Sequence, residues 1–407
     1  MRVERLTTQE QLFQSKQVIE TAFLHPWDED AARNEAREQA EGTAAQPEEA
    51  WGLYDDSGAM VASVATIPRA FFFGGEAVPV GEIHMVGSLP EARGGGYARA
   101  LIREILGHFA QRGDVFAALI PFSYSFYRKF GFELAARTLT QRVPIDQLAG
   151  LRCNYEVTRL ASEADVAEIR AFYERFASMR NLAELRGDAA WAYKGGGEYG
   201  ERDFMHSDCQ GYTYVLRDAG AVCAYVTFIY VTGADGPFVG ELKVTDIAYD
   251  SPQALLGVLG FLYRMRAKVT HVTLELPDDL DLGVVLPECE DVERTLGGHV
   301  MLRVLDVVRA LELMPHPTGE GSYVVRVEDA FMPANSGAYR VRFGSGGTRV
   351  ERTDDAADLE VTEETLCQLV AGRINLDDAR YRAGTVIHTR ETLLGQVFVR
   401  RPIALDL

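Results

Sequence analysis

The sequence predicts an α/β protein with mixed sheets, made of a duplicated unit followed by a third α/β region. Three observations predict this fold class. Apolar stretches alternate with turn residues, which is typical of antiparallel strands. A long amphipathic stretch at residues 98–109 lies between two apolar strands, which predicts one parallel crossover. Finally, residues 242–276 repeat the strand–helix–strand pattern of residues 82–120, which indicates an internal repeat.

The first unit begins with antiparallel strands and continues into the crossover. Residues 51–54 and 59–67 flank the turn Asp55-Asp56-Ser57-Gly58, and the next hairpin turns at Gly74-Gly75. The expected elements after the first hairpin are strands at residues 70–73, 77–80 and 82–89, the helix at 98–109, a strand at 115–120 and a short helix at 125–130.

A second unit starts after Arg152, and a third region starts near Met301. Ser162-Glu163-Ala164-Asp165 is a capping box that opens a helix reaching Met179. Strands at residues 212–216 and 222–231 and the repeated segment follow. The third region mixes strands at residues 323–327, 338–343 and 385–388 with helices at 362–370 and 390–396. The expected domains are residues 1–152, 153–296 and 297–407.

The size and charge of the chain limit its possible functions. A chain of 407 residues exceeds what one hydrophobic core usually supports, so two or three domains are expected. The formal net charge of −19 argues against a nucleic-acid partner and suits a cationic one, such as an amine substrate. Acidity that only aids solubility is the alternative.

Two further features bear on compartment and metal content. The basic residues at the start precede no apolar stretch, and the longest apolar runs are too short to span a bilayer. We therefore expect a cytoplasmic protein with no membrane partner. The five cysteines are scattered and form no CxxC pair, which predicts neither a disulfide framework nor a metal site.

The glycine-rich loop Arg-Gly-Gly-Gly-Tyr-Ala at residues 93–98 lies between a strand and the long helix. Glycines allow close backbone approach and positive φ, and a helix N-terminus adds unpaired N–H groups and a positive dipole end. Together with the charge of Arg93, these features predict a pyrophosphate site. Three glycines alone would indicate only a flexible turn. The spacing Arg-x-x-Gly-x-Ala matches the coenzyme A loop of the GNAT acetyltransferases and neither a P-loop nor a Rossmann fingerprint.

The motif Phe-Tyr-Arg-Lys-Phe-Gly-Phe at residues 126–132 follows this loop and resembles the Eis (enhanced intracellular survival) subfamily of the GNAT acetyltransferases. The repeat, residues 301–306 and the tail also fit that subfamily. The resemblance implies two tandem GNAT folds and a sterol-carrier-protein-like C-terminal domain. It also implies acetyl transfer from acetyl-CoA to amines, notably aminoglycosides, without a metal, by a homohexamer.

The resemblance also implies roles for individual residues. Tyr127 becomes the general acid that protonates the departing thiolate of coenzyme A, which a phenol at short range is able to do. Packing beside Phe126 and Phe130 is the alternative for Tyr127. The implied cofactor-binding residues come from the strand before the loop, the loop itself and the segment after the next strand: Val86, Gly87, Ser88, Arg93, Gly94, Gly95, Gly96, Tyr97, Ala98, Arg99, Phe122 and Ser123.

A base must also take a proton from the attacking amine, because an ammonium has no lone pair. In the Eis subfamily the terminal α-carboxylate does this, a role that falls here to Leu407, although known members usually end in an aromatic residue. Asp406 matches a penultimate acidic residue and would bind a cationic acceptor. A frayed terminus is the alternative for both. Glu82 and His84, on one face of the strand before the loop, are alternative bases.

Two rivals to a small-amine acetyltransferase stay open at the level of sequence. One is a protein-lysine acetyltransferase, because the sequence does not describe the acceptor pocket. The other is a non-catalytic module whose third domain carries an apolar ligand, which the intact loop and Tyr127 disfavour. In the second unit, residues 250–255 read Asp-Ser-Pro-Gln-Ala-Leu and lack both the glycines and the arginine. We therefore expect one coenzyme A site per chain.

Overall fold

The computed structural model describes residues 1–44, 48–160, 162–188, 191, 202–203, 206–233, 236–277, 280–286, 288 and 290–404. The chain divides into two compact units. The first unit comprises Met1–Ala136, Asn181–Glu184 and His299–Leu407, and the second comprises Arg137–Arg180 and Leu185–Gly298. The first unit therefore contains both the predicted cofactor loop and the C-terminal region.

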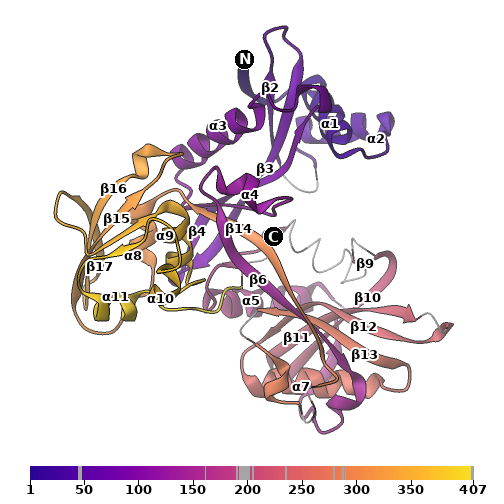
Figure 1. Cartoon of the computed structure of the whole chain (residues 1–407). Coiled ribbons are helices and arrows are strands. Elements are labelled where there is room, and N and C mark those ends of the chain that lie inside the picture. Colours follow the sequence, from indigo (N-terminus) through magenta and orange to yellow (C-terminus); the bar gives the residue numbers. More distant parts are fainter. Residues whose placement is uncertain are drawn as a thin grey trace. The chain divides into compact units, whose positions relative to one another are not determined.

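The N-terminal part of the first unit is a mixed sheet with strand order β1-β2-β3-β4-β5-β14 (Figure 1). Among the described pairings, β4 and β5 run parallel, whereas β1–β2, β2–β3, β3–β4 and β5–β14 are antiparallel. This arrangement confirms the mixed sheet with one crossover. The strands are β1 (Arg2–Leu6), β2 (Glu49–Tyr54), β3 (Met60–Phe73), β4 (Glu76–Ser88), β5 (Phe116–Leu119) and β14 (Glu293–Val304), of which β14 enters this unit at residue 299.

Helices cover both faces of this sheet (Figure 1). They are α1 (Gln9–Phe23), α2 (Glu29–Glu41), α3 (Tyr97–Arg112) and the short α4 (Tyr124–Arg128). Helix α3 makes the crossover between β4 and β5 and buries the predicted apolar stripe: Leu101, Ile102, Ile105, Leu106 and Phe109. It packs closely on β4, because a Cβ atom added at Gly81 would lie 2.3 Å from the Phe109 ring.

The long hairpin of β3 and β4 differs from the predicted pattern of shorter strands. The sequence suggested breaks between residues 67 and 70 and between residues 80 and 82. Instead, Pro68 lies opposite Gly81 within one continuous ladder, and the chain turns once, at Gly74 and Gly75, where φ is 60° and 87°. The strand continues past Pro68 because the residues on both sides of it stay paired with β4. The long β4 therefore reaches from this turn to the predicted cofactor loop.

The C-terminal part of the first unit is a five-stranded sheet with strand order β17-β16-β15-β18-β19. The strands are β15 (Gly321–Glu328), β16 (Gly337–Gly344), β17 (Gly347–Thr353), β18 (Leu359–Thr362) and β19 (Val386–Ile387), and the helices are α8 (Val307–Leu313), α9 (Glu363–Ala371), α10 (Leu376–Ala379) and α11 (Glu391–Val397). Phe73 and Phe116 of the N-terminal part belong to the same buried core as Val325 and Leu369 of the C-terminal part. The two parts therefore share one hydrophobic core.

The second unit repeats the plan of the N-terminal sheet, with strand order β6-β13-β12-β11-β10-β7. Strands β12 and β13 are parallel and are joined through α7, as β4 and β5 are joined through α3, which confirms the predicted repeat. The elements are β6 (Glu133–Pro144), β7 (Glu156–Arg159), α5 (Glu163–Ser178), β10 (His206–Asp218), β11 (Ala221–Gly233), β12 (Gly236–Tyr249), α7 (Pro252–Leu262) and β13 (Val269–Pro277). The predicted capping box opens α5, since the Ser162 side chain accepts from Asp165 N.

Further properties of the described residues concern membrane-spanning helices, metal-binding groups and free cysteines. Within them, no helix combines the length and apolarity needed to cross a membrane. In the same part of the chain, no group of three or more His, Cys, Asp or Glu side chains is placed to hold a metal ion. Cys153, Cys223 and Cys367 are free thiols.

Candidate active site

Strand β4 extends beyond the end of β5 at the edge of the sheet where the predicted cofactor site lies. Strand β5 ends at Leu119, opposite Ile83, whereas β4 continues to Ser88. The stretch of β4 beyond Ile83 stays paired with β3 across a bulge, where Met85 takes a φ of 50°. Its outer edge therefore has no neighbour in β5, and a bulge leaves the main-chain groups of its extra residue unpaired. The predicted main-chain ligands Val86, Gly87 and Ser88 lie in this stretch.

Gly87 also has a packing role that the sequence did not indicate. A Cβ atom at this position would lie 2.9 Å from Ile19 Cδ1 and 3.1 Å from Ala22 Cβ. Helix α1 therefore packs against the bare backbone of β4 at the bulge. A larger residue at position 87 would displace α1 from the edge that carries the predicted cofactor ligands.

The glycine loop forms an open N-terminus for α3. Gly96 is the N-cap of α3, with a φ of 78° and no side-chain cap, and the first turn of the helix holds no acidic residue. Gly94 has a φ of 86°, and a Cβ atom at Gly94 or Gly96 would meet no atom within 4 Å. Both positions need glycine for their left-handed backbone rather than for space. The exposed N–H groups and the positive end of α3 suit an anion such as a pyrophosphate.

Arg93 of the loop and Arg99 in the first turn of α3 contact other parts of the first unit. Arg93 Nη2 donates a hydrogen bond of 3.0 Å to the carbonyl oxygen of Ala22, at the end of α1. The guanidinium carbon of Arg99 lies 5.1 Å from the centre of the Phe331 ring. Arg93 nevertheless remains exposed. It therefore fixes the loop against α1 while its charge stays at the loop.

Tyr127 is buried in a group of aromatic rings, with 3% of its surface exposed. Its ring centre lies between 5.1 and 6.5 Å from those of four neighbours: Phe122, Phe126, Phe130 and Phe132. Burial raises the pKa of Tyr127 to about 12. Within the described residues, no hydrogen bond joins the Tyr127 hydroxyl to another group. The phenol is thus protonated at neutral pH and has its proton free to donate.

The predicted site residues share one core. Tyr127 belongs to the buried cluster formed by α3 and β5, and Val86, Tyr97 and Phe126 pack against that cluster. Ser123 is the N-cap of α4, where its Oγ accepts a hydrogen bond from Phe126 N at 3.4 Å. Phe122 packs against Tyr127 but is 70% exposed, so it presents an apolar face to a ligand.

The two local candidates for the base differ in their surroundings. Glu82 is 4% exposed, and its Oε2 accepts a 2.8 Å hydrogen bond from Arg69, which also donates to Glu184 in β8 (Ala183–Glu184). Glu82 is therefore held in an ion pair and is almost fully enclosed. His84 is 44% exposed, and its Nδ1 lies 3.8 Å from Glu82 Oε1. His84 is therefore the freer of the two.

Glu48 is a further carboxyl group beside this pair, and no pattern in the sequence indicated it. Burial raises its pKa, while the neighbouring charges of His84 and Lys16 oppose that rise. It precedes β2 in a segment without a motif, so only the fold brings it near His84. Together with Glu82 it places two carboxyl groups near His84.

The predicted tail residues Asp406 and Leu407 lie outside the described residues. The tail is described as far as Ala404, whose N–H donates a 2.9 Å hydrogen bond to the carbonyl oxygen of Asn181. Ile403 forms a parallel bridge with Asn181. The segment that begins at Asn181 continues into β8, whose Glu184 shares Arg69 with Glu82. The tail therefore runs beside the segment whose Glu184 is joined to Glu82 through Arg69.

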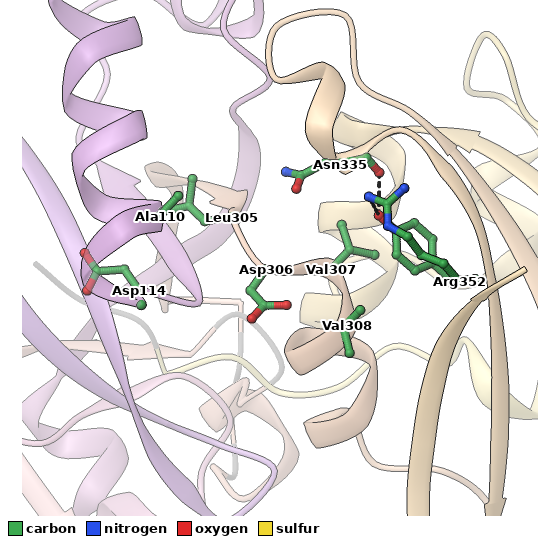
Figure 2. Close-up of a pocket in the computed structure, with 10 residues that line it drawn as sticks. Ala110, Asp114, Leu305, Asp306, Val307, Val308, Asn335 and Arg352 are labelled. Carbon is green, nitrogen blue, oxygen red and sulfur yellow. Dashed lines mark hydrogen bonds between the residues drawn. The ribbon is translucent and has the colours of Figure 1, made fainter.

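A pocket of about 180 Å³ lies at the other end of α3 and is distinct from the predicted cofactor site. Figure 2 shows Asp114 and Asp306 beside it, with Asn335 and Arg352 toward its far wall. Arg352 donates to Ser336 O at 3.0 Å and to the Tyr339 hydroxyl at 2.9 Å, so this guanidinium is already partnered. The cofactor loop lies at the N-terminus of the 16-residue α3, about 24 Å along the helix.

Comparison with known proteins identifies the domains. Residues 4–135 and residues 183–304 each match a family described as an acetyltransferase (GNAT) domain, and residues 307–402 match a sterol carrier protein domain. An uncharacterized N-acetyltransferase of Streptomyces coelicolor is 27% identical over 372 residues, which cover 86% of this chain and 85% of that protein. The chain is an N-acetyltransferase with two GNAT domains. Its acetyl donor is acetyl-CoA, as the GNAT fold implies.

Solved structures of GNAT proteins have the same fold along the whole chain. An Eis protein from Mycobacterium abscessus superposes with a TM-score of 0.80 at 20% identity, covering all of both chains. A GCN5-related N-acetyltransferase from Anabaena variabilis superposes with a TM-score of 0.83 at 20% identity, covering 99% of this chain and 98% of that one. These likenesses confirm two tandem GNAT folds followed by a sterol-carrier-protein-like domain.

The two GNAT domains differ at the helix that follows the central strand. In the first, α3 starts at the uncapped Gly96. In the second, the side chain of Ser251 caps α7 by accepting from Ala254 N at 3.2 Å, and Pro252 occupies the first turn. A capped helix end has fewer N–H groups for an anion. This contrast supports the prediction of a single coenzyme A site.

Proposed function

We propose that the first GNAT domain transfers acetyl from acetyl-CoA to a primary amine of a cationic acceptor, an aminoglycoside-like molecule or a polyamine. Tyr127 acts as the general acid. The observation that carries this proposal is the buried, protonated Tyr127 hydroxyl, which shares a core with residues of α3, β4 and β5. Its proton has no partner among the described residues, so it is available to a departing thiolate.

The donor site is assigned to the residues around the open end of α3. The loop N–H groups bind the pyrophosphate of coenzyme A, and the main chain of Val86, Gly87 and Ser88 orients the thioester carbonyl. The residues that make up the rest of this proposed site are Arg93, Gly94, Gly95, Gly96, Tyr97, Ala98, Arg99, Phe122 and Ser123. Arg99 contributes through its backbone, since its side chain lies on Phe331.

The acid step follows from the pKa of Tyr127. A thiolate with a pKa of about 8.5 is a weaker base than a phenolate with a pKa of about 12. Full proton transfer to a free thiolate is therefore uphill, and the hydroxyl acts first by donating a hydrogen bond as charge develops on sulfur. The surrounding apolar rings strengthen this bond by excluding water. As the C–S bond breaks and the N–C bond forms, the phenol proton passes to sulfur.

The base is assigned to the α-carboxylate of Leu407, with Asp406 as a contact for the cationic acceptor. Ala404 is anchored on Asn181, and the three residues that follow it in the sequence can reach at most about 10 Å. That anchor lies in the segment leading to Glu184. A carboxylate arriving there would take the amine proton, which balances the proton given up by Tyr127. His84 is the alternative base.

The acidic surroundings favour a cationic acceptor. Glu48 and Glu82 lie near His84, Glu184 joins Glu82 through Arg69, and the whole chain carries a net charge of −19. Such a site raises the local concentration of a cation and speeds its arrival, an effect that salt screens. A protein-lysine acceptor remains the second candidate, because lysine presents the same ammonium.

A panel of amines followed by thiol release tests this function. The panel contains aminoglycosides, spermidine, a lysine peptide and a neutral primary amine of similar size. We expect polyvalent cations to give a kcat/KM at least tenfold above the neutral amine, and added salt to reduce that advantage. Equal turnover of the neutral amine would contradict the cationic-acceptor assignment, and preference for the peptide would favour the second candidate.

The cellular and quaternary assignments also stay proposals. We place the enzyme in the cytoplasm as a homo-oligomer, a hexamer by resemblance, with domain limits at residues 1–152, 153–296 and 297–407. Light scattering of the purified chain measures the assembly. A monomer at micromolar concentration would contradict the hexamer.

A further inference from the structure

A buried charged group lies where the C-terminal region meets the first GNAT domain. Arg303 in β14 is fully buried, and its Nη2 donates to Asp329 Oδ2 at 2.5 Å. Glu363, 2% exposed, accepts from Val304 N at 3.1 Å. Burial raises the pKa of Glu363 well above its usual range, which favours the protonated carboxyl beside the Arg303–Asp329 ion pair.

Asp329 uses its second oxygen to order a turn. Its Oδ1 accepts from Phe331 N at 3.0 Å and from Met332 N at 2.8 Å. The turn places the Phe331 ring, 6% exposed, against two helices of the first domain. The guanidinium carbons of Arg99 and Arg103 in α3 each lie 5.1 Å from its centre. On the other side, the Phe130 ring lies 5.3 Å from it.

The same group holds the end of the helix that carries Tyr127. Arg303 Nη1 donates to the carbonyl oxygen of Phe130 at 2.5 Å. Phe130 N in turn donates to the carbonyl oxygen of Tyr127 at 2.9 Å. At Gly131, where φ is 80°, a Cβ atom would lie 1.4 Å from Arg303 Nη1. Glycine at this position therefore lets the arginine reach the helix end.

A second contact from the C-terminal region reaches the residue next to Tyr127. Arg128 forms a two-point ion pair with Glu133, at 2.8 and 2.9 Å, and Arg382 donates to Glu133 Oε2 at 2.6 Å. Burial alone would raise the pKa of Glu133, but its bonds to Arg128, Leu134 N and Arg382 outweigh burial and lower it. The carboxylate stays charged and joins both arginines.

These contacts matter because no hydrogen bond to the Tyr127 hydroxyl fixes its position within the described residues. Helix α4 has five residues, too few to form a stable helix alone. The hydroxyl makes no hydrogen bond within the described part of the chain, so its position depends on ring packing and on the backbone of α4. A displacement of about 1 Å at a reacting group can cost about 10²-fold in rate.

We infer that Arg303 at the end of β14, together with Phe331 and Arg382 of the sterol-carrier-protein-like region, positions the general acid Tyr127. The Phe331 ring contacts Phe130, just after α4, and two arginines of α3. It therefore packs against both the helix of the general acid and the helix of the donor site. The C-terminal region is thus part of the catalytic apparatus. This inference rests on the proposed role of Tyr127.

A double-mutant cycle on the full chain tests the inference. The variants are Phe331→Leu, Tyr127→Phe and the combination, with kcat and the KM for acetyl-CoA measured for each. Phe331→Leu should lower kcat about tenfold in the wild-type background and less than twofold in the Tyr127→Phe background. The matched control is Phe343→Leu, since Phe343 is also 6% exposed in the C-terminal region but stacks on His316. We expect this control to keep kcat within twofold.

The outcomes separate this inference from the proposed function. If Tyr127→Phe retains full activity, the role of Tyr127 itself is wrong. If Tyr127→Phe loses activity but Phe331→Leu costs the same factor in both backgrounds, only the positioning inference is overturned. Arg382→Gln gives an independent arm, because the Arg382 side chain is 32% exposed and the variant should fold. It should show the same background-dependent loss in kcat, and equal losses in both backgrounds would again contradict the inference.

Discussion

Arg303 and Phe130, which are 173 positions apart, meet in a buried 2.5 Å hydrogen bond from the arginine Nη1 to the phenylalanine carbonyl oxygen. The bond joins the strand leading into the C-terminal region to the end of the helix that carries Tyr127. It has a buried ion pair on one side and an aromatic contact on the other. The first GNAT domain and the C-terminal region therefore build the surroundings of Tyr127 together.

Two similar substitutions in this buried group should differ greatly in their effect on stability. Glu363→Gln should change the free energy of unfolding by less than about 1 kcal/mol, because burial favours a neutral carboxyl at this position and the amide is neutral too. Asp329→Asn should cost about 3–5 kcal/mol, because it leaves Arg303 charged and buried without its partner. Urea denaturation measures both. Equal destabilisation by the two variants would show that Glu363 is charged.

Local patterns in the sequence predicted much of this architecture. The stripe from Leu101 to Phe109 predicted α3, and the glycine loop before it predicted an open helix end, because both depend on neighbouring residues. The repeat predicted the second sheet. The Arg303 group could not be predicted, since its partners come from distant segments and the motif that contains Phe130 does not indicate which residue contacts it. The bulge at Met85 is likewise a tertiary feature, because it depends on the ladder with β3.

The open end of α3 should bind one acetyl-CoA per chain and should be sensitive to negative charge. Gly96→Asp and Gly96→Asn both tolerate the left-handed backbone and both can cap the helix. The aspartate alone adds a charge where the pyrophosphate is proposed to bind. Calorimetry should show one site in the wild type and at least tenfold weaker binding for Gly96→Asp than for Gly96→Asn. Two equivalent sites, or equal affinities for the two variants, would contradict the assignment.

The proposed base depends on where the chain ends. An extension of a few residues after Leu407 should abolish turnover, because it replaces the carboxylate by an amide and adds bulk. Acetyl-CoA affinity should persist, and the same residues added before Met1 serve as the control. Leu407→Phe should be tolerated, since no side chain is needed. An extended enzyme with full kcat would exclude the tail, and His84→Gln would then be the next variant to assay.

The raised pKa of Tyr127 predicts a specific response to alkali. Burial moves it from 10.0 to about 12, so the unfolded chain ionises first as pH rises. The stability that this shift contributes is fully present below pH 10 and is lost between pH 10 and about 12. Tyr127→Phe cannot ionise and should lose less stability over that interval, by about 2 kcal/mol. Identical alkaline losses in urea denaturation would show that Tyr127 titrates normally.

The most direct test of the account is the effect of Tyr127→Phe on turnover and on donor binding. The variant keeps the ring that packs among Phe122, Phe126, Phe130 and Phe132 and removes only the hydroxyl. We expect kcat for the best amine of the panel to fall by about 10²–10⁴-fold, as for a missing general acid. The Kd for acetyl-CoA should stay within about twofold, because the loop and the α3 terminus are untouched. A kcat within a few-fold of the wild-type value would contradict the account and leave Tyr127 as a packing residue.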